Sequence, residues 1–336
     1  DDPLLTTNGQ SNTAFGAVDG STSGSESGSL GYVGRFNYAF ADKYLFEFLF
    51  RSDASTRFAP ENYWGKFYSL SGGWVISKEN FFKSSVIDFL KIRYSVGMLG
   101  SDGTKAWQWR QRFTYQNGQG IVIGNNNATT GLKMEVTPNR DATWSDELKT
   151  NFGIDAKFLN NRLSLTTEAY YNVATNVLMS RTADVPFTVG GSVASENYGR
   201  RDNYGYEFSV GWDDKIGEDF KYGINVNFGW GDDKMVKGDF NKVEALKPWG
   251  DKAGQSSDNG VWGWDYVGML KTQEDIDNYV NKYNIKSVFG VLAANLRPGS
   301  LSYADVRGPM NTITGEFAPA DGIVDERGLA VMLRVH

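Results

Sequence analysis

A long, strict alternation of apolar and polar residues is the feature that most constrains what this chain can fold into. From Phe220 to Trp230 the even-numbered residues are aromatic or aliphatic, and the odd-numbered residues are Lys, Gly or Asn. A period of two places the two sets on opposite faces of a β-strand. At about 3.3 Å per residue this stretch spans about 36 Å, which exceeds the apolar band of an outer membrane, about 25 Å tall. The alternation therefore predicts a strand that crosses a membrane.

The same alternation recurs in residues 32–40, 90–98, 152–158, 163–173 and 206–212, and residues 44–51 are more apolar, with Glu47 and Arg51 on the minority face. The alternative is a soluble sandwich or solenoid, but strands in globular proteins usually have about 5–6 residues. The mean hydropathy of −0.43 fits a membrane wall, because barrel strands place a polar residue after each apolar one. We therefore predict an all-β fold, a transmembrane antiparallel β-barrel.

The connections between these stretches alternate in length. Short turns are expected at Ala41-Asp42, at Asn160-Asn161 and from Asp213 to Asp219. Long polar connections are expected at residues 52–62, 100–147, 174–203 and 231–260. Short periplasmic turns and long extracellular loops are typical of outer-membrane barrels. Residues 1–30 are predicted to be a polar loop and residues 31–336 part of the barrel, with a short loop helix at Asp275 to Ile285.

Composition excludes several function classes. The chain has no cysteine, and its one histidine is the last residue, His336. A Ser-His-Asp triad or a thiolate or histidine metal site is therefore not expected. No local pattern selects a pair of carboxylates for glycoside hydrolysis. The formal net charge of −6 argues against nucleic-acid binding, so we expect a protein that is not an enzyme and binds no nucleic acid.

Several sequence blocks resemble the SusC/RagA family of TonB-dependent transporters of the Bacteroidota. The most specific is Arg-Phe-Ala-Pro-Glu-Asn at residues 57–62, followed by Trp64-Gly65. Other matching blocks lie at residues 34–38, 42–47, 69–77, 90–97, 137–139 with Trp144, 151–155, 161–164, 298–306 and 321–326. The resemblance covers most of the chain from Gly31 onward.

The resemblance implies a 22-stranded barrel in the bacterial outer membrane, with a plug, a TonB connection through an N-terminal region, and a SusD-like surface lipoprotein in a 2:2 assembly. We expect this chain to be a part of roughly ten strands, without the plug, the TonB box and the closing strands. The implied function is TonB-dependent import of a large nutrient, an oligosaccharide or a peptide. The alternatives are a surface glycan-binding or structural barrel without transport, and a secreted β-rich hydrolase.

Three groups of residues are candidates for function. Polar residues of the alternating strands are expected to face the lumen, where they wet the interior or contact the plug: Arg35, Asn37, Lys91, Arg93, Asp155, Lys157, Glu168, Asn225 and Asn227. Loop tryptophans could stack on sugars, although loop packing or contact with the lipoprotein is favoured: Trp107, Trp109, Trp249, Trp262 and Trp264.

An acidic segment near the end of the chain is the third candidate. Asp321, Asp325 and Glu326, with Asp305 upstream, form a weak calcium-loop pattern in which Gly322 only partly fits the turn position. The alternative, a solvated acidic loop, is favoured because few oxygen ligands are visible. No other cofactor is expected.

Overall fold

The computed structural model describes residues 27–116, 122–123, 127–128, 131–134, 136–182, 192–217 and 219–333. The chain forms two compact units, Asp1–Asp239 and Phe240–His336, and each is described by itself. Most of the polar loop expected at residues 1–30 lies outside the described residues. Its last two residues, Ser29 and Leu30, already belong to the first strand.

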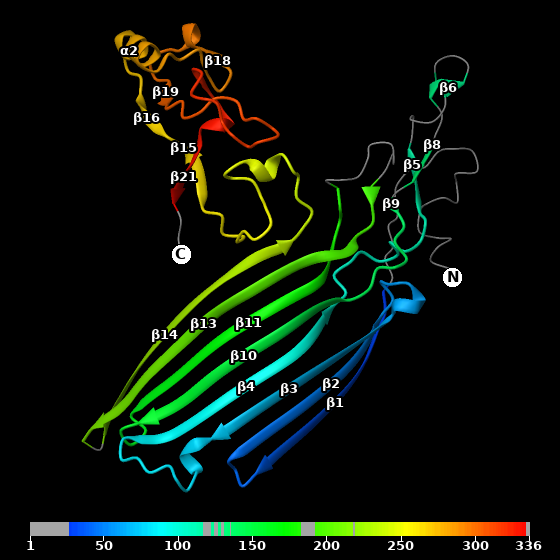
Figure 1. The fold of residues 1–336 in the computed structure, drawn as a ribbon, viewed down its shortest axis with the longest axis vertical. Coiled ribbons are helices and arrows are strands. Elements are labelled where there is room, and N and C mark those ends of the chain that lie inside the picture. The colour runs from blue at the N-terminus through cyan, green and yellow to red at the C-terminus, as the bar shows by residue number, and fades with distance from the viewer. Residues whose placement is uncertain are drawn as a thin grey trace. The chain divides into compact units, whose positions relative to one another are not determined.

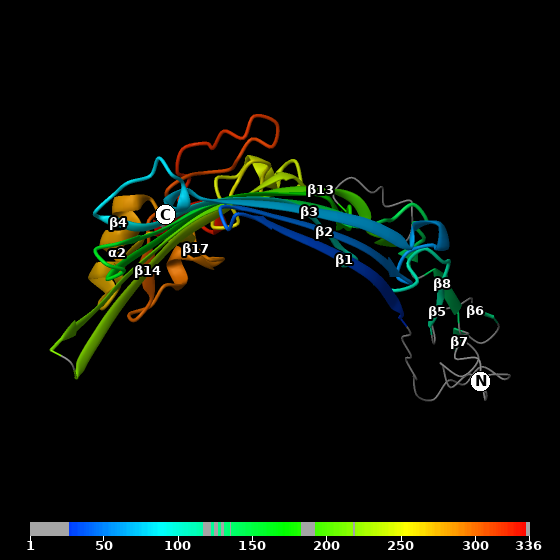
Figure 2. The same ribbon diagram turned by 90° about the horizontal axis from the view of Figure 1, so that it is seen from below.

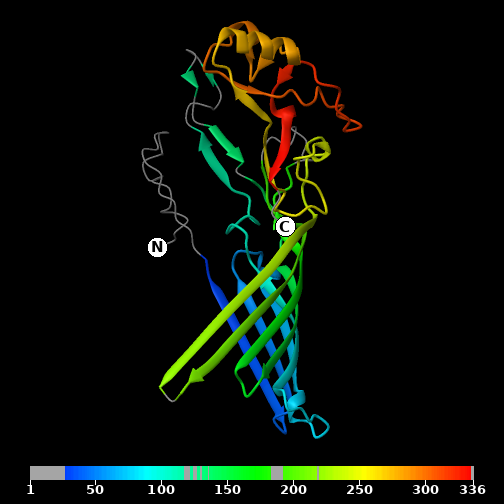
Figure 3. The same ribbon diagram turned by 90° about the vertical axis from the view of Figure 1, so that its left-hand side faces the viewer.

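The first unit is built on one antiparallel sheet of eight strands in the order β1-β2-β3-β4-β10-β11-β13-β14 (Figure 1). This sheet is curved and twisted along its length (Figure 2, Figure 3). Its strands are β1 (Ser29–Phe40), β2 (Tyr44–Ser55), β3 (Trp64–Val75), β4 (Ile87–Ser101), β10 (Ser145–Phe158), β11 (Leu163–Met179), β13 (Glu196–Ile216) and β14 (Phe220–Lys237).

The strands run further than the apolar alternation predicted. β13 has 21 residues and β14 has 18, so both extend into stretches that were expected to be loop or turn. The turn expected from Asp213 to Asp219 is shorter, because β13 continues to Ile216. Backbone hydrogen bonds hold a ladder together whether or not the side chains are apolar, so the apolar alternation does not mark the ends of the strands.

The short turns lie at one end of the sheet and the long connections at the other (Figure 1). Ala41 and Asp42 both have φ of 51°, and Asn160 and Asn161 have φ of 59° and 62°. Two successive residues with positive φ are typical of the tight turns that match the twist of a hairpin. The predicted positions of these two turns are therefore confirmed.

Three small pairings lie in the long connections of this unit. β5 (Phe113–Gln116) pairs with β8 (Gly131–Met134), and β6 (Val122–Ile123) pairs with β7 (Asn127–Ala128). β9 (Val136–Thr137) runs parallel to β12 (Ser192–Val193). Two 3-10 turns, η2 (Pro60–Asn62) and η3 (Ile76–Lys78), complete the unit.

The described part of the second unit has only short strands. The long sheet of the chain, in the first unit, has eight strands, where roughly ten were expected. β15 (Val261–Trp264) pairs with β21 (Leu329–Leu333), and β16 (Tyr266–Met269) pairs with β19 (Leu301–Tyr303). β17 (Ser287–Val288) lies between β18 (Val291–Leu292) and β20 (Ile323–Val324). The 3-10 turns are η5 (Glu244–Leu246), η6 (Ala293–Asn295) and η7 (Glu326–Gly328).

The predicted loop helix is confirmed as α2 (Gln273–Tyr283). Thr272 caps it, because its hydroxyl accepts from the Asp275 amide while the Asp275 carboxylate accepts from the Thr272 amide. Ile276 and Tyr279 are buried in a core with Leu270, Ile285, Val288, Leu296 and Val324. No helix among the described residues is long and apolar enough to cross a membrane.

Candidate functional site on the polar face of the sheet

The register of the eight strands separates the sheet into two chemically distinct faces. Phe208 pairs with Phe228, and Val210 pairs with Val226, so even-numbered residues of β13 and β14 share one face. The same continuity links Phe36 to Phe48 and Phe48 to Leu70 across β1, β2 and β3. This apolar face carries exposed side chains along every strand, among them Phe36, Tyr38, Phe46, Leu70, Tyr94, Phe152, Tyr206, Phe208, Ile224, Val226 and Phe228.

Aromatic residues close this apolar face at the short-turn end. The ring of Tyr44 stacks on those of Phe40 and Trp74, at centroid distances of 6.4 and 6.5 Å. The polar tips of Tyr44 and Trp74 donate to the carboxylate of Glu79, at 2.7 and 3.1 Å. Amphipathic rings with one apolar and one polar end are typical of a membrane–water boundary.

The opposite, polar face carries every residue that was predicted to face a lumen. Register places Lys91 beside Asp155, Arg93 beside Gly153, and Gly153 beside Glu168. Arg35 and Asn37 lie on the same face of β1, and Asn225 and Asn227 on that of β14. The sequence pattern thus assigned a common face to these residues, and their role in transport remains a prediction.

Arg93 joins three strands of the polar face. Its guanidinium contacts the carboxylate of Asp155 on β10, at 3.1 Å, and that of Glu168 on β11. Asn151 donates to the second oxygen of Glu168 at 3.0 Å. Gly153 lies between Arg93 and Glu168 in the register, and a Cβ there would be 2.8 Å from the Arg93 guanidinium. Glycine at residue 153 therefore gives the arginine a path across β10.

Two open grooves lie along β3 and β4. The groove nearer the long connections has a volume of about 600 Å³, and the groove nearer the short turns about 510 Å³. Both include Ser95, and small residues of these strands line them: Ser69, Ser71, Gly73 and Gly97. Long charged side chains of β2, β4 and β10 stand beside them: Glu47, Arg51, Asp53, Lys91, Arg93 and Lys149.

Charged side chains beside these grooves pair with one another. Arg51 pairs with Asp53 at 2.6 Å, and Arg35 pairs with Glu47 at 3.6 Å. Volumes of a few hundred Å³ with a few placed polar groups are typical of ligand sites. The sequence pattern placed Glu47 and Arg51 on the polar face without naming them as candidates. It missed Asp53 and Lys149, which the register of β2 and β10 places on the same face.

The Arg-Phe-Ala-Pro-Glu-Asn block forms a packed core at the long-connection end. Phe58 is 1% exposed and Ala59 is fully buried, and the Phe58 ring lies 5.6 Å from that of Trp144. Asn62 donates to the carbonyls of Arg140 and Ala142, and Glu61 binds Arg140 through both oxygens. The motif therefore connects two long loops of the first unit and holds their ends against the sheet.

Trp107 and Trp109 lie together in one of these loops. Their ring centroids are 5.9 Å apart, and the guanidinium of Arg110 lies over both, at 4.9 and 4.5 Å. Arg140 approaches Trp109 from another side, at 5.7 Å. Trp109 is only 9% exposed, so these contacts favour the packing interpretation over a sugar platform for this residue.

The other three tryptophans lie in the second unit. Trp249 contacts Trp262 edge-on and has the guanidinium of Arg307 over its ring, at 5.6 Å. The Trp262 indole donates to Asn259, and that of Trp264 donates to the Asp325 carbonyl at 2.9 Å. Trp264 is 38% exposed and contacts Phe289. The polar atoms of Trp262 and Trp264 thus both have partners within the second unit.

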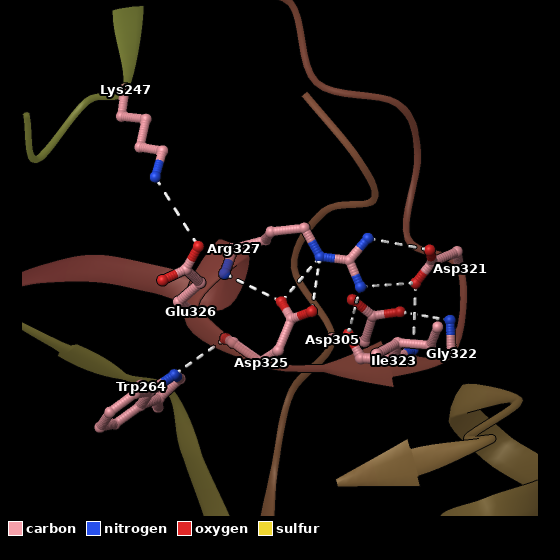
Figure 4. A network of polar contacts seen from close by, with 9 residues as sticks. All are labelled: Lys247, Trp264, Asp305, Asp321, Gly322, Ile323, Asp325, Glu326 and Arg327. Carbon is pink, nitrogen blue, oxygen red and sulfur yellow. Dashed lines mark hydrogen bonds and ion pairs between the residues drawn. The ribbon is translucent and has the colours of Figure 1, made fainter. Parts of the chain in front are cut away.

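The acidic segment is organised around Arg327 (Figure 4). Its guanidinium pairs with Asp325 at 2.7 Å and with Asp321 at 3.0 Å. These two carboxylates raise the pKa of Arg327 above its ordinary value, although desolvation acts in the opposite direction. Asp305 accepts from the Gly322 amide. No group of three or more metal-binding side chains is found in the described ranges. Calcium binding by Asp321 and Asp325 stays a prediction, with an arginine as the competing partner.

Comparison with known proteins identifies relatives of one kind. No family model matches the chain. It is 31% identical over 154 residues to the TonB-dependent receptor SusC of Bacteroides thetaiotaomicron, which covers 45% of this chain and 15% of that protein. It is 28% identical over 298 residues to the TonB-dependent receptor P3 of Formosa agariphila, which covers 86% of this chain and 28% of that protein. The chain thus spans less than a third of either relative.

Solved structures agree with the sequence matches. The RagAB peptide importer in its open-open state matches with a TM-score of 0.64 and 19% identity, over 95% of this chain and 31% of that chain. Its closed-closed state matches with a TM-score of 0.63 over 90% of this chain. At this identity the likeness is one of fold, and it confirms the predicted barrel architecture. The relatives are receptors and not enzymes, which confirms that expectation as well.

Proposed function

Because the chain belongs to the SusC-like TonB-dependent receptors, we propose that it forms part of the barrel wall of an outer-membrane importer for a large nutrient. The observation that carries this proposal is the continuous register that gives the sheet one apolar and one polar face. In a bilayer the apolar face contacts lipid and the polar face lines an aqueous interior. Arg35, Lys91, Arg93, Glu168, Asn225 and Asn227 then belong to the wall along which the solute moves.

The proposal includes the partners of the family. Import draws energy from the TonB complex, and a SusD-like lipoprotein covers the extracellular side in a 2:2 assembly. The long connections at one end of the sheet support an extracellular partner surface, because they offer large ordered loops such as the one held by Phe58 and Trp144. The candidate substrates are an oligosaccharide or a peptide.

The alternative is a surface glycan-binding or structural barrel without transport. The experiment measures accumulation of labelled oligosaccharides and peptides by cells that carry the full-length gene, lack it, or lack TonB. We expect one substrate class to accumulate only when both the gene and TonB are present. Binding to the cell surface that persists without TonB, with no accumulation in any strain, would instead support the alternative.

A further inference from the structure

Tyr170 is an aromatic residue on the polar face of its strand. In β11 the odd-numbered residues continue the apolar face, since Ala169 pairs with Tyr206 and Tyr171 pairs with Tyr204. Tyr170 therefore points to the polar face, beside Asn151 on one neighbouring strand and Gly205 on the other. Most aromatic rings of this sheet lie on the apolar face, and Tyr170 shares the polar face with Phe67 of β3 and Phe89 of β4.

The next two strands have glycine where the Tyr170 side chain lies. Gly205 of β13 pairs with Tyr170, and Gly231 of β14 pairs with Gly205. A Cβ at Gly205 would lie 2.7 Å from Cζ of Tyr170, and a Cβ at Gly231 would lie 2.5 Å from its hydroxyl oxygen. Neighbouring strands are about 4.8 Å apart. The ring therefore lies along the wall across β13, with one side against backbone and the other facing away from the sheet.

Polar side chains lie on the β10 side of Tyr170. Asn151 lies next to Tyr170 in the register, and its amide bonds the carboxylate of Glu168, two residues before Tyr170. Glu168 in turn contacts Arg93. These amide, carboxylate and guanidinium groups therefore lie on the β10 side of Tyr170, and the ring itself lies over β13. A pyranose ring has the complementary chemistry, because its C–H face packs on an aromatic ring while its hydroxyl groups exchange hydrogen bonds at the rim.

We propose that Tyr170 is a stacking residue for a pyranose ring of the imported solute, and that Gly205 and Gly231 are the positions that let its ring lie against the wall. This inference rests on the proposed function and names its substrate class as a neutral oligosaccharide. Tyr170 binds by the face of its ring, the Asn151 amide exchanges hydrogen bonds with sugar hydroxyls beyond the ring, the Glu168 carboxylate accepts from them, and Arg93 holds Glu168 in place.

The test uses the purified full-length transporter and calorimetric titration with maltohexaose, cellohexaose and mannohexaose, with hexaalanine as the peptide comparison. Tyr170→Ala should weaken binding of the preferred sugar about tenfold, the size of a good aromatic contact. Tyr170→Phe keeps the ring and should bind within about twofold of the wild type, because a loss of 1 kcal/mol of binding free energy would already weaken binding about fivefold.

Gly231→Ala tests the geometry, because its Cβ would meet only the Tyr170 hydroxyl within 3.5 Å. We expect it to weaken sugar binding as Tyr170→Ala does. The double variant Tyr170→Phe with Gly231→Ala should recover binding, because without the hydroxyl the nearest ring atom is Cζ, 3.8 Å away. Gly229→Ala is the matched control on the same face of β14, where the nearest atom, Cγ of Glu207, is 3.7 Å away.

Two results would overturn the inference. Either Tyr170→Ala binds the sugar as the wild type does, or the wild type binds hexaalanine and none of the sugars. Accumulation by cells that carry the same variants separates this outcome from failure of the proposed function. If wild-type and Tyr170→Ala cells accumulate the sugar equally, the stacking role is wrong and import stands; if wild-type cells accumulate neither class, import itself is wrong.

Discussion

At the scale of single residues, the most connected group at the short-turn end is the carboxylate of Glu79. It accepts hydrogen bonds from Tyr44, from Trp74 and from the ammonium of Lys43 at 3.1 Å. These contacts lower the pKa of Glu79 from 4.5 to about 2. One carboxylate therefore fixes the polar ends of two boundary aromatics from neighbouring strands, together with the turn that connects β3 to β4.

The lowered pKa of Glu79 predicts a specific acid dependence. A carboxylate whose pKa is lower in the folded state stabilises that state above its unfolded pKa, and the contribution is lost as pH falls towards the folded pKa. The relevant window therefore runs from about 4.5 down to about 2. Glu79→Gln should reduce stability near neutral pH and flatten the dependence within this window, as measured by urea unfolding in lipid vesicles.

The control for this measurement is Asp42→Asn at the same end of the sheet. Asp42 is 83% exposed and has one long ion pair, with Lys78 at 3.6 Å. Exposed pairs of this kind contribute little, so the control should keep the acid dependence of the wild type. An identical loss in both variants would contradict the role given to Glu79.

At the scale of elements, α2 shows how a short helix is made stable inside a loop. Its capping box satisfies amides at the first turn, and Asn284 ends the helix in the left-handed conformation, with φ of 51°. Ile276 and Tyr279 bury its apolar side, and the Tyr279 hydroxyl donates to the Tyr303 carbonyl at 2.6 Å. Local capping and a small core thus act together, since a helix of this length is marginal in water on its own.

Removing the cap should loosen α2 without unfolding the barrel. Thr272→Ala deletes the hydroxyl that accepts from the Asp275 amide, and loss of such a cap costs about 1 kcal/mol. Amides of the helix should then exchange with solvent about fivefold faster, measured by hydrogen exchange and mass spectrometry. Thr272→Ser keeps the hydroxyl and should exchange like the wild type; equal acceleration in both variants would show that the cap is not the cause.

At the scale of the whole molecule, one sheet serves two environments. In the proposed importer, alternate residues of β14 contact lipid or the aqueous interior, so neighbouring positions in sequence experience opposite solvents. The Arg-Phe-Ala-Pro-Glu-Asn block and Trp144 connect the loops at one end, and the Glu79 group holds the turns at the other. The membrane-facing middle carries the alternation itself.

An adjacent pair of substitutions tests this division. Val226→Arg places a charge on the apolar face and should destabilise the folded barrel by about 2–4 kcal/mol near the bilayer midplane. Asn227→Arg, one residue along, places the same charge on the polar face and should change stability by less than about 1 kcal/mol. Unfolding in vesicles of the full-length protein measures both, and equal costs would contradict the assignment of faces.

The sequence alone determined the class of fold, the faces of the residues within the alternating stretches, the two hairpin turns and the loop helix. It could do so because the alternation of side chains between the two faces of a strand and the residue preferences of tight turns are local properties. The resemblance to SusC/RagA also came from the sequence, since the residues at 57–62 are specific.

Only the tertiary structure decided how far the strands extend, that the sheet has eight of them, and which charges meet across it. Arg93 reaches Glu168 because two strands with the right register place Gly153 between them, and Arg327 lies between Asp321 and Asp325 because a loop folds back. Tyr170 is a further example. Its position in the alternation gives the face on which it lies, but only the glycines of two further strands decide how its ring lies. Such contacts depend on residues far apart in sequence, and no local pattern encodes them.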